Sequence, residues 1–478
     1  TMGEEIDVVE FSEDDYLRFH EKLHQENQLL HQWFSEGKLD TEKPVAGFEL
    51  EAWLLDEYYR PAPLNETYLE KLASPLASPE LASFNFEINS TPQKLQAHAL
   101  SGLYSELVQT WKSCQDTAEE MGCQSVMIGI LPTLQNEDLN LANMSKMTRY
   151  RALNREVIRQ RRGKPLVFDI NGVEHLHVTH RDVMLEAAAT SFQIHIQVAP
   201  ETAARFYNAS IIAAGPMVAL SANSPYLFGK DLWDETRIPV FEQAVAVGGF
   251  GGAAFGPIKR VTFGSGYART SLEECFDENV EHYPILLPVD YKEGTDRLRH
   301  LRLHNGTIWR WNRPLIGFNE QGKPHLRIEH RVVPAGPSLI DTIANAAFYY
   351  GVVAALVEQE IAPESQLVFD KSRDNFYNSA RHGLRANVQW LDDKQHNVRE
   401  LCLDALLPMA RRGLGMLGIS NDDSDEYLKI IEQRLYQETN GATWQRQFIN
   451  KYGHDMTAML KAYIERQNSG QPVHEWTV

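Results

Sequence analysis

Two glutamates, two positions apart, make the strongest chemical pattern in the chain. The run Gly47-Phe48-Glu49-Leu50-Glu51 places Glu49 and Glu51 in an apolar segment that we expect to be a strand at about 45–55. Side chains two apart in a strand project from the same face. Two carboxylates about 7 Å apart on one face suit a hard divalent cation, which prefers oxygen ligands. A solvated strand edge is the alternative for this segment taken alone.

Three further segments alternate in the same way. Each carries bulky apolar residues on one face and metal-ligand or phosphate-binding side chains on the other. The polar members are Asn85, Glu87 and Asn89, then Gln193, His195 and Gln197, then Arg327, Glu329 and Arg331. An ordinary half-buried strand would instead carry Ser, Thr and Lys outward. Four strands of this kind predict a sheet that lines a charged, wet cavity.

The elements that must hold these strands follow from the order of patterns along the chain. The polar strands fall before residue 335, and helical periodicity dominates from 338 to 478, where the last helix is expected at 442–467. Further helices are expected at 95–121 and 201–221, a buried strand at 124–130, and a loop with a short helix at 64–82. This order predicts an α+β fold, in which helices cover one side of a curved, mainly antiparallel sheet. Ser12 and Asp15 begin a helix that Gly37 ends. Residues 1–44 are therefore expected to be a helical appendage, used for packing or oligomer formation, and residues 45–478 a single domain.

The composition excludes several classes of partner. The chain has 46 basic and 65 acidic residues, a net charge of −19, which argues against a nucleic-acid or anionic-membrane surface. Bound metal ions and local arginines can still hold an anionic substrate. We find no run of about 20 apolar residues and no secretory signal, so no membrane span is predicted. Four scattered cysteines without a Cys-x-x-Cys pair favour buried thiols in a reducing cytoplasm.

Some motifs leave two interpretations open. Arg151 and Arg155, one helical turn apart, face water or hold a substrate carboxylate or phosphate. The histidines at 175, 177 and 180 are expected to be structural or at the surface, because strand spacing brings only two together. The glycine-rich stretch 247–266 is a lid over the site or a plain loop, and no Gly-Lys-Ser/Thr closes it as in a P-loop.

A last pattern lies just before the fourth polar strand. In the run Gly306 to Pro314, Trp309, Trp311 and Arg313 alternate and would share one face. The guanidinium of Arg313 then lies against an indole, or the three side chains are in ordinary packing contact.

Several further motifs join the polar strands in one ordered set. Its pieces are Gly-x-Glu-x-Glu at 47–51, the Glu87 strand ending in Thr91-Pro92, Arg149-Tyr150-Arg151, the His195 strand, Leu220 to Pro225, Gly306 to Pro314, Glu329-x-Arg331, Asp374 to Tyr377 and Ala380 to Leu384. Each motif is weak by itself, whereas the ordered set from about 45 to 420 is specific. Taken in order, these segments resemble the second type of glutamate–cysteine ligase, also called the carboxylate–amine ligase family, which has a glutamine-synthetase-like fold.

The resemblance implies ATP-dependent amide formation through an acyl phosphate, as in glutathione biosynthesis, between a small carboxylate such as glutamate and an amine such as cysteine. It further implies two or three Mg²⁺ ions and a site with distinct roles. The metal ligands would be Glu49, Glu51, Glu87, His195 and Glu329, the catalytic groups Arg313 and Arg331, and the nucleotide-binding groups these two arginines with Gln193 and Gln197.

Other functions remain open on the same fold. A small-molecule phosphotransferase would use the same sheet, and a non-catalytic nucleotide- or metal-binding relative is the third alternative. The departures from the usual family pattern at Gln193, Gln197 and Asn312 leave the amine open, and the sequence does not fix the acid. We expect a cytoplasmic protein, with a homo-oligomer possible.

Overall fold

The structure is a computed structural model that describes residues 5–42, 44–247 and 259–478. Most of the glycine-rich stretch predicted to be a lid or a loop, residues 248–258, lies outside the described residues.

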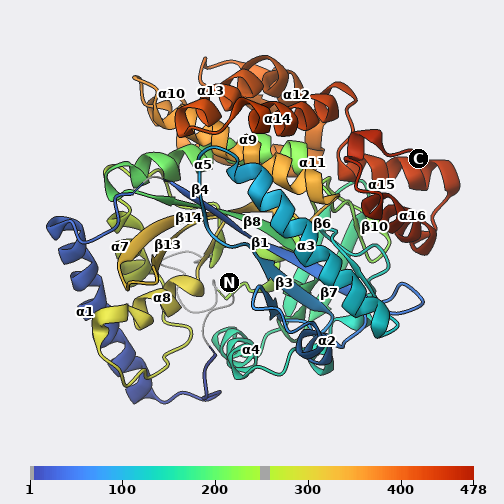
Figure 1. Ribbon diagram of the computed structural model, residues 1–478. Helices are drawn as coiled ribbons and strands as arrows, with labels where there is room; N and C mark the ends of the chain where they lie inside the picture. Colours follow the sequence, from blue (N-terminus) through green and yellow to red (C-terminus); the bar gives the residue numbers. More distant parts are fainter. Residues whose placement is uncertain (1–4, 43, 248–258) are drawn as a thin grey trace.

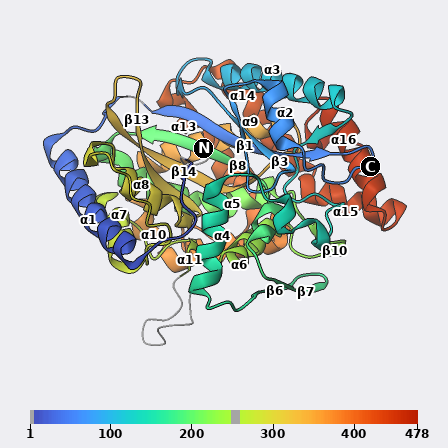
Figure 2. The ribbon, with the colours of Figure 1, turned by 90° about the horizontal axis from the view of Figure 1, so that it is seen from below.

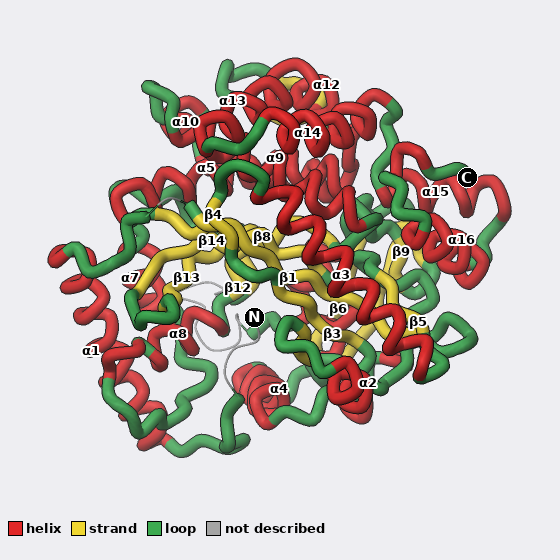
Figure 3. The backbone as a smooth tube through the Cα atoms, viewed as in Figure 1, coloured by secondary structure: helices red, strands yellow, loops and turns green. Residues whose placement is uncertain are grey.

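An antiparallel sheet forms the centre of the molecule (Figure 1). Its order is β13-β14-β8-β1-β3-β2, and β4 and β5 pair with β1 beside this path. The bounds are β1 Val45–Leu55, β2 Ala77–Pro79, β3 Asn85–Asn89, β4 Gln93–Lys94, β5 Gln124–Val126, β8 Ser191–Val198, β13 Asn312–Phe318 and β14 Pro324–Pro334. The four predicted polar strands are thus the neighbours β14, β8, β1 and β3. The sheet curves around the middle of the molecule, with helices outside it (Figure 3).

The register of these strands brings the polar side chains together. Glu51 pairs with Glu87 across β1 and β3, while His195 on β8 pairs with Glu329 on β14. Arg313 on β13 is in turn the partner of Glu329. Because paired residues point to the same face, one row runs across the sheet as Arg313, Glu329 and His195.

Helices cover the apolar face of the sheet. α5 (Pro200–Ser221) and α9 (Leu339–Val357) contact its strands, and α11 (Phe369–His382), α13 (Leu407–Leu417) and α14 (Asn421–Tyr436) pack against these two helices. The hydroxyl of Tyr350 on α9 donates to the carbonyls of His195, at 2.8 Å, and Gly47, at 3.2 Å. This contact fixes β1 and β8 relative to each other, directly behind the His195 side chain.

Helix α9 is long and apolar enough to cross a membrane by length and composition. However, 94% of its apolar window is buried inside the structure, against α5, α13, α14 and β8. A core helix passes the same test, so this helix is explained by its packing.

The polar face of the sheet is framed by a second set of helices. They are α1 (Glu13–Glu36), α4 (Thr148–Gln160), α6 (Arg237–Ala244), α7 (Glu273–His282) and α8 (Arg299–Gly306). Seen from below, α1 lies along α7 and α8, and α4 stands beside the sheet (Figure 2). The predicted ends of α1 are confirmed: Ser12 and Asp15 form a capping box, and Gly37 has φ 68°.

The N-terminal helix is tied into the molecule through one buried carboxylate. Glu26 on α1 is fully buried and accepts the backbone N–H groups of His300, at 2.9 Å, and Leu301, at 3.0 Å. It also pairs with Nδ1 of His300 at 2.6 Å. These N–H groups belong to the first turn of α8, which has no intrahelical acceptor for them. Glu26 therefore caps α8 from a separate helix.

Two predicted elements were wrong in extent. The helix expected at 442–467 is two helices, α15 (Gly441–Tyr452) and α16 (Met456–Asn468), because Gly453 adopts φ 95° and Asp455 caps α16. The buried strand expected at 124–130 ends at Val126. The remaining elements are α2 (Asn65–Leu72), α3 (Ala99–Glu120), α10 (Pro363–Gln366), α12 (Val398–Leu401), β6 (Leu166–Asn171), β7 (His175–His180), β9 (Tyr226–Leu227), β10 (Lys230–Asp231), β11 (Val261–Thr262), β12 (Trp309–Arg310), β15 (Asn387–Gln389) and β16 (Gln395–Asn397).

Candidate active site

Three adjacent strands bring Glu49, His195 and Glu329 into one buried group. Nε2 of His195 lies 3.7 Å from Oε1 of Glu49 and 3.4 Å from Oε2 of Glu329. One ligand atom from each residue lies within 4.8 Å of the other two. We call this group the triad. Its atoms are close enough to share a single cation.

The chemistry of the triad fits a divalent cation. Burial, together with the charge of Arg327, lowers the pKa of His195 well below its usual range, so the imidazole is neutral. Its Nε2 is buried and has no hydrogen-bond partner within the described part of the chain. A neutral imidazole and two carboxylate oxygens are donors that metal ions accept.

Glu329 connects the triad to two arginines. Its Oε1 lies 3.0 Å from Nη2 of Arg313 and 3.0 Å from Nε of Arg331. Burial opposes ionisation of Glu329, but the two guanidinium groups outweigh it and lower its pKa to about 2. Glu329 is therefore ionised at neutral pH, with one oxygen turned to the arginines and the other to His195.

An open cavity lies on the polar face of the sheet, next to the triad. We call it the carboxylate cavity, because five glutamates line it: Glu49, Glu51, Glu80, Glu87 and Glu186. Its other lining residues include Ser191 and Gln193 on β8, Trp309 and Trp311 around β12, and the arginines 149, 237, 313 and 331.

The glutamates of this cavity are crowded. Burial raises the pKa of Glu51 to about 7, and the charge of Glu87 adds to it, although Ser191 donates to Glu51 at 2.7 Å. Burial and the charge of Glu51 likewise raise the pKa of Glu186 to about 7. The pKa of Glu80 is raised by burial and then by the charges of Glu51 and Glu87. Carboxylates held this close together are stabilised by a bound cation.

A second cavity lies on the other side of the pair formed by Arg313 and Glu329. We call it the arginine cavity, because arginines 149, 299, 302, 313 and 327 line it beside Phe276, Tyr291, Leu315 and Ile316. Glu329 is the one acidic residue among its described lining residues. Arginines favour phosphate and carboxylate groups, so this cavity suits a polyanion. Arg149, Gly306 and Arg313 line both cavities.

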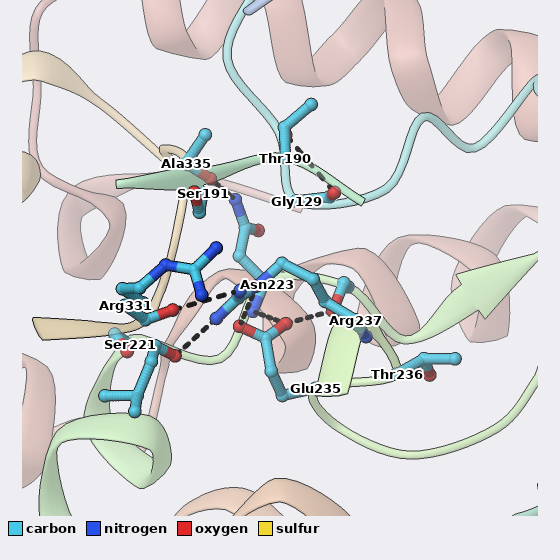
Figure 4. Close-up of polar contacts among 12 residues, drawn as sticks. Gly129, Thr190, Ser191, Ser221, Asn223, Glu235, Thr236, Arg237, Arg331 and Ala335 are labelled. Carbon is cyan, nitrogen blue, oxygen red and sulfur yellow. Dashed lines mark hydrogen bonds and ion pairs between the residues drawn. The ribbon is translucent and has the colours of Figure 1, made fainter. Parts of the chain in front are cut away.

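Arg331 is held by a buried network below the sheet. The register of β14 shifts between His330 and Val333, so Arg331 lies in an irregular turn of the strand. Figure 4 shows Arg237 reaching this point, where it donates to the carbonyl of Arg331 at 3.2 Å and pairs with Glu235 at 3.5 Å. Asn223 donates to the carbonyl of Ala335 at 2.9 Å. The 220–225 motif therefore supports the irregular end of β14.

Most of the predicted site residues are brought together. Those that line the carboxylate cavity are Glu49, Glu51, Glu87, Gln193, Arg313 and Arg331, with His195 and Glu329 in the triad beside it. Gln197 is the exception: it lines neither cavity among the described residues and lies 3.5 Å from Asp40. Its nucleotide-binding role stays a prediction.

The motifs left open are now placed. Arg151 and Arg155 are exposed, as in the water-facing alternative, and Arg155 pairs with Glu10 at 3.2 Å. His175 and His177 are exposed on β7, and His180 is buried beside Asn136. Trp309, Trp311 and Arg313 all line the carboxylate cavity, where the guanidinium of Arg237 lies 5.5 Å from the Trp311 ring centre.

The sequence missed several lining residues. Glu80 lies between two short strands in a segment predicted to be loop and short helix, and Glu186 lies in a 3₁₀ turn at Met184–Ala188. Neither position belongs to a periodic pattern. Arg149 belongs to the motif Arg149-Tyr150-Arg151, but the spacing of one helical turn pointed to Arg151 and Arg155 instead. The signal for Arg149 was its place at the start of a helix, two residues ahead of Arg151.

The sheet, the triad and the two cavities can be compared with known proteins. The family model of glutamate–cysteine ligase family 2 matches residues 45–470. The fold and this match define a carboxylate–amine ligase. The chain belongs to glutamate–cysteine ligase family 2. No curated protein matches its sequence.

Solved structures agree on the fold. The chain is similar to the glutamate–cysteine ligase of Francisella tularensis in complex with AMP, at 10% identity and a TM-score of 0.59, with 90% of each chain covered. It is also similar to a bifunctional glutathione synthetase from Pasteurella multocida, at 10% identity and a TM-score of 0.50, covering 95% of this chain and 55% of that one. The predicted α+β, glutamine-synthetase-like fold is therefore confirmed.

Proposed function

We propose that the protein is an ATP- and Mg²⁺-dependent ligase that joins a small carboxylate, glutamate in the first instance, to an amine such as cysteine. The observation that carries the proposal is the position of Glu329. One of its oxygens lies 3.4 Å from Nε2 of His195 in the triad, and the other lies 3.0 Å from both Arg313 and Arg331. Groups for a cation and groups for a phosphate thus meet at one side chain.

The residues present fit bound magnesium. Glu49, His195 and Glu329 would hold one ion, and Glu51 and Glu87, which pair across β1 and β3, would hold another, with Glu80 close enough to share their charge. These two positions agree with the two or three ions that the family resemblance implies. Magnesium bound there would neutralise phosphate oxygens as two anions approach each other.

The reaction we propose has two steps. The γ-phosphoryl group of ATP moves to a carboxylate oxygen of the acid, so that ADP leaves and an acyl phosphate forms. The amine then attacks the acyl carbon, phosphate leaves, and one proton is lost to solvent or base. Arg313 and Arg331 would stabilise the charge on the transferred group, which is worth roughly 10³-fold or more in related phosphoryl transfers. The buried floor of the site limits hydrolysis of the intermediate.

The arrangement of the chain is part of the proposal. The family match begins at residue 45, which supports one ligase domain at 45–478 with the helical segment 1–44 attached to it. Besides ATP, the substrates are an acid that reacts through its γ-carboxylate and an amine. A cytoplasmic location and a homo-oligomer stay predictions.

Product analysis tests the proposed function. With glutamate fixed and amino acids supplied in turn, ADP, phosphate and an amide must appear in equal amounts. Release of AMP and pyrophosphate would contradict an acyl-phosphate route. Hydroxylamine added without an amine should give a hydroxamate, whereas a phosphorylated product stable to hydroxylamine would favour the phosphotransferase alternative.

A further inference from the structure

Arg149 has no role in the function proposed above, although it lines both cavities. It is the second residue of α4, the helix that stands over the polar face of the sheet. The other arginine common to both cavities is Arg313, which is already paired with Glu329 at 3.0 Å. Arg149 therefore approaches the junction from the opposite wall.

One terminal nitrogen of the Arg149 side chain has no hydrogen-bond partner among the described residues. This nitrogen, Nη1, is buried. Nη2 lies near Gly306: a Cβ atom added to this glycine would lie 3.8 Å from Nη2. A buried donor without an acceptor is unfavourable. A ligand oxygen at the junction would satisfy it.

The backbone below this side chain is fixed from the N-terminal segment. The carboxylate of Glu5 accepts the N–H of Thr148 at 3.1 Å and the N–H of Arg149 at 2.9 Å. Both N–H groups lie in the first turn of α4 and lack an intrahelical acceptor. The backbone of Arg149 is thus fixed before any ligand binds, which favours a preorganised group that stabilises developing charge.

The charges around the junction indicate which ligand this is. On one side stand the arginines of the arginine cavity, which suit a polyphosphate. On the other side stand the glutamates, which suit cations and the reaction partners brought with them. A group that moves between the two cavities must pass Arg149 and Arg313.

We propose that Arg149 is a further catalytic residue, which binds the γ-phosphoryl group at the junction as it passes from nucleotide to acid. The inference rests on the proposed function. In that step the bond from the γ-phosphorus to the bridging oxygen of ADP breaks, and a bond from the same phosphorus to the carboxylate oxygen forms. ADP leaves with the electron pair. Arg149 donates from Nη1 to a non-bridging oxygen of the group in transfer.

Nucleotide binding separates this role from a structural one. In the presence of Mg²⁺, we would measure the affinities of ADP and of the β,γ-imido analogue of ATP, which keeps a γ-phosphoryl group but does not react. Arg149→Gln should weaken binding of the analogue roughly ten- to a hundredfold and leave ADP within about threefold, since one charge-assisted hydrogen bond is lost. Arg149→Lys should recover part of the loss.

Matched controls exist on the same helix. Arg151→Gln and Arg155→Gln, both at exposed positions, should leave both affinities unchanged. Thermal melting of each variant shows that the fold is kept, and Arg149→Lys serves if Arg149→Gln does not fold.

Three results would overturn the inference. The first is an equal loss for ADP and the analogue, and the second is no loss for either together with a raised KM for the acid, which would make Arg149 a carboxylate-binding residue. In both cases the wild-type chain still binds nucleotide, so the proposed function stands. The third is a wild-type chain that binds neither nucleotide, which removes the proposed function as well.

Discussion

The two cavities differ in charge although they share a wall. One presents five glutamates, and the other presents five arginines around Glu329. Strand β14 explains how they are joined: Arg327, Glu329 and Arg331 alternate along it, and Arg327 lines the arginine cavity while Arg331 lines the carboxylate cavity. The alternating side chains of this one strand therefore place the arginine cavity beside the carboxylate cavity, with Glu329 between them.

The linings of the two cavities suit different reactants. Guanidinium groups and aromatic side chains in the arginine cavity suit a nucleotide, whereas the crowded glutamates need cations and cannot hold an anionic acid without them. In the proposed function, the reaction takes place at the boundary between the two cavities, beside the triad.

Substitution at the boundary should have the largest effect. Glu329→Gln removes a charge that contacts His195 on one side and Arg313 and Arg331 on the other, so the two guanidinium groups lose their counter-charge. We expect amide formation to fall by roughly 10³-fold or more, as when electrostatic groups at a phosphoryl centre are removed. Steady-state turnover measures it, with the exposed Glu320→Gln as control. Turnover within tenfold of wild type would show that the boundary is misplaced.

Changes confined to one cavity should separate the substrates. Arg327→Ala should raise the KM for ATP by roughly tenfold or more, because a charge-assisted contact to phosphate is lost. It should change the KM values of acid and amine much less. The exposed Lys323→Ala, on the adjoining turn, should leave all three unchanged. An Arg327 variant with an altered KM for the amine alone would break the assignment of the cavities.

The opposite pattern is expected in the carboxylate cavity. Glu186→Gln replaces one of its five carboxyl groups, in a 3₁₀ turn outside the paired strands β1 and β3. It should alter the KM for acid or amine by a few-fold, a partly screened charge effect, and leave the KM for ATP in place. A larger change in the KM for ATP than in the KM for the acid or the amine would argue against placing the acid and the amine in the carboxylate cavity. Initial rates at varied concentrations of each substrate give all three constants.

A smaller effect on catalysis is expected from the contact between α1 and α8, the helix that borders the arginine cavity. We call this contact the brace. Glu26→Ala removes the buried partner of His300 and the cap of α8, which carries Arg299 and Arg302. Breaking a buried pair in this way should destabilise the fold by about 3 kcal/mol. Urea unfolding measures this free energy, and the exposed Glu21→Ala on the same helix is the control. Equal stability of the two variants would show that α1 is not a brace.

A weaker, pH-dependent contact links the same helix to α7. His31 lies 2.6 Å from Glu273 and 2.7 Å from Asp277. Burial lowers the pKa of His31, but the hydrogen bonds and charges of the two carboxylates outweigh it and raise the pKa above 6.5. The stabilising contribution is therefore complete below pH 6.5 and is lost as pH rises through the raised pKa.

The effect should be small, because the His31 side chain is 42% exposed. The melting temperature of His31→Gln should differ from that of wild type mainly on the acidic side, and the two should converge at alkaline pH. His24→Gln, exposed on the same helix, should not show this dependence. A difference that grows with rising pH would have the wrong sign for this contact.

How much of this could be predicted from the sequence depends on the range of the interaction. Period-two alternation placed Glu49 with Glu51, and Gln193 with His195, on shared faces, because side-chain direction in a strand is local. That His195 pairs with Glu329, or Glu51 with Glu87, is a property of register and needs the folded sheet. The resemblance to the ligase family, and not the local pattern, grouped residues of separate strands into one predicted site.

The residues that were missed have a common cause. Glu80 and Glu186 reach the cavity from a loop and a 3₁₀ turn, where no periodicity marks the direction of a side chain. Arg327 was recognised on its strand face, but its cavity is also lined by Arg299 and Arg302 of α8, and that contact depends on how the helix packs against the sheet. The division of one helix into two at Gly453 depended on a left-handed conformation that glycine permits without requiring it.

In the proposed function, side chains from separate strands form one magnesium–nucleotide site. Calorimetric titration of ATP into the protein, with Mg²⁺ and then with excess chelator, tests this site, and Glu49→Gln is measured in parallel. We expect binding that needs Mg²⁺ and is weakened by at least tenfold in Glu49→Gln, since a charged metal ligand is lost. Equal ATP affinity with and without Mg²⁺ in the wild-type chain would contradict it.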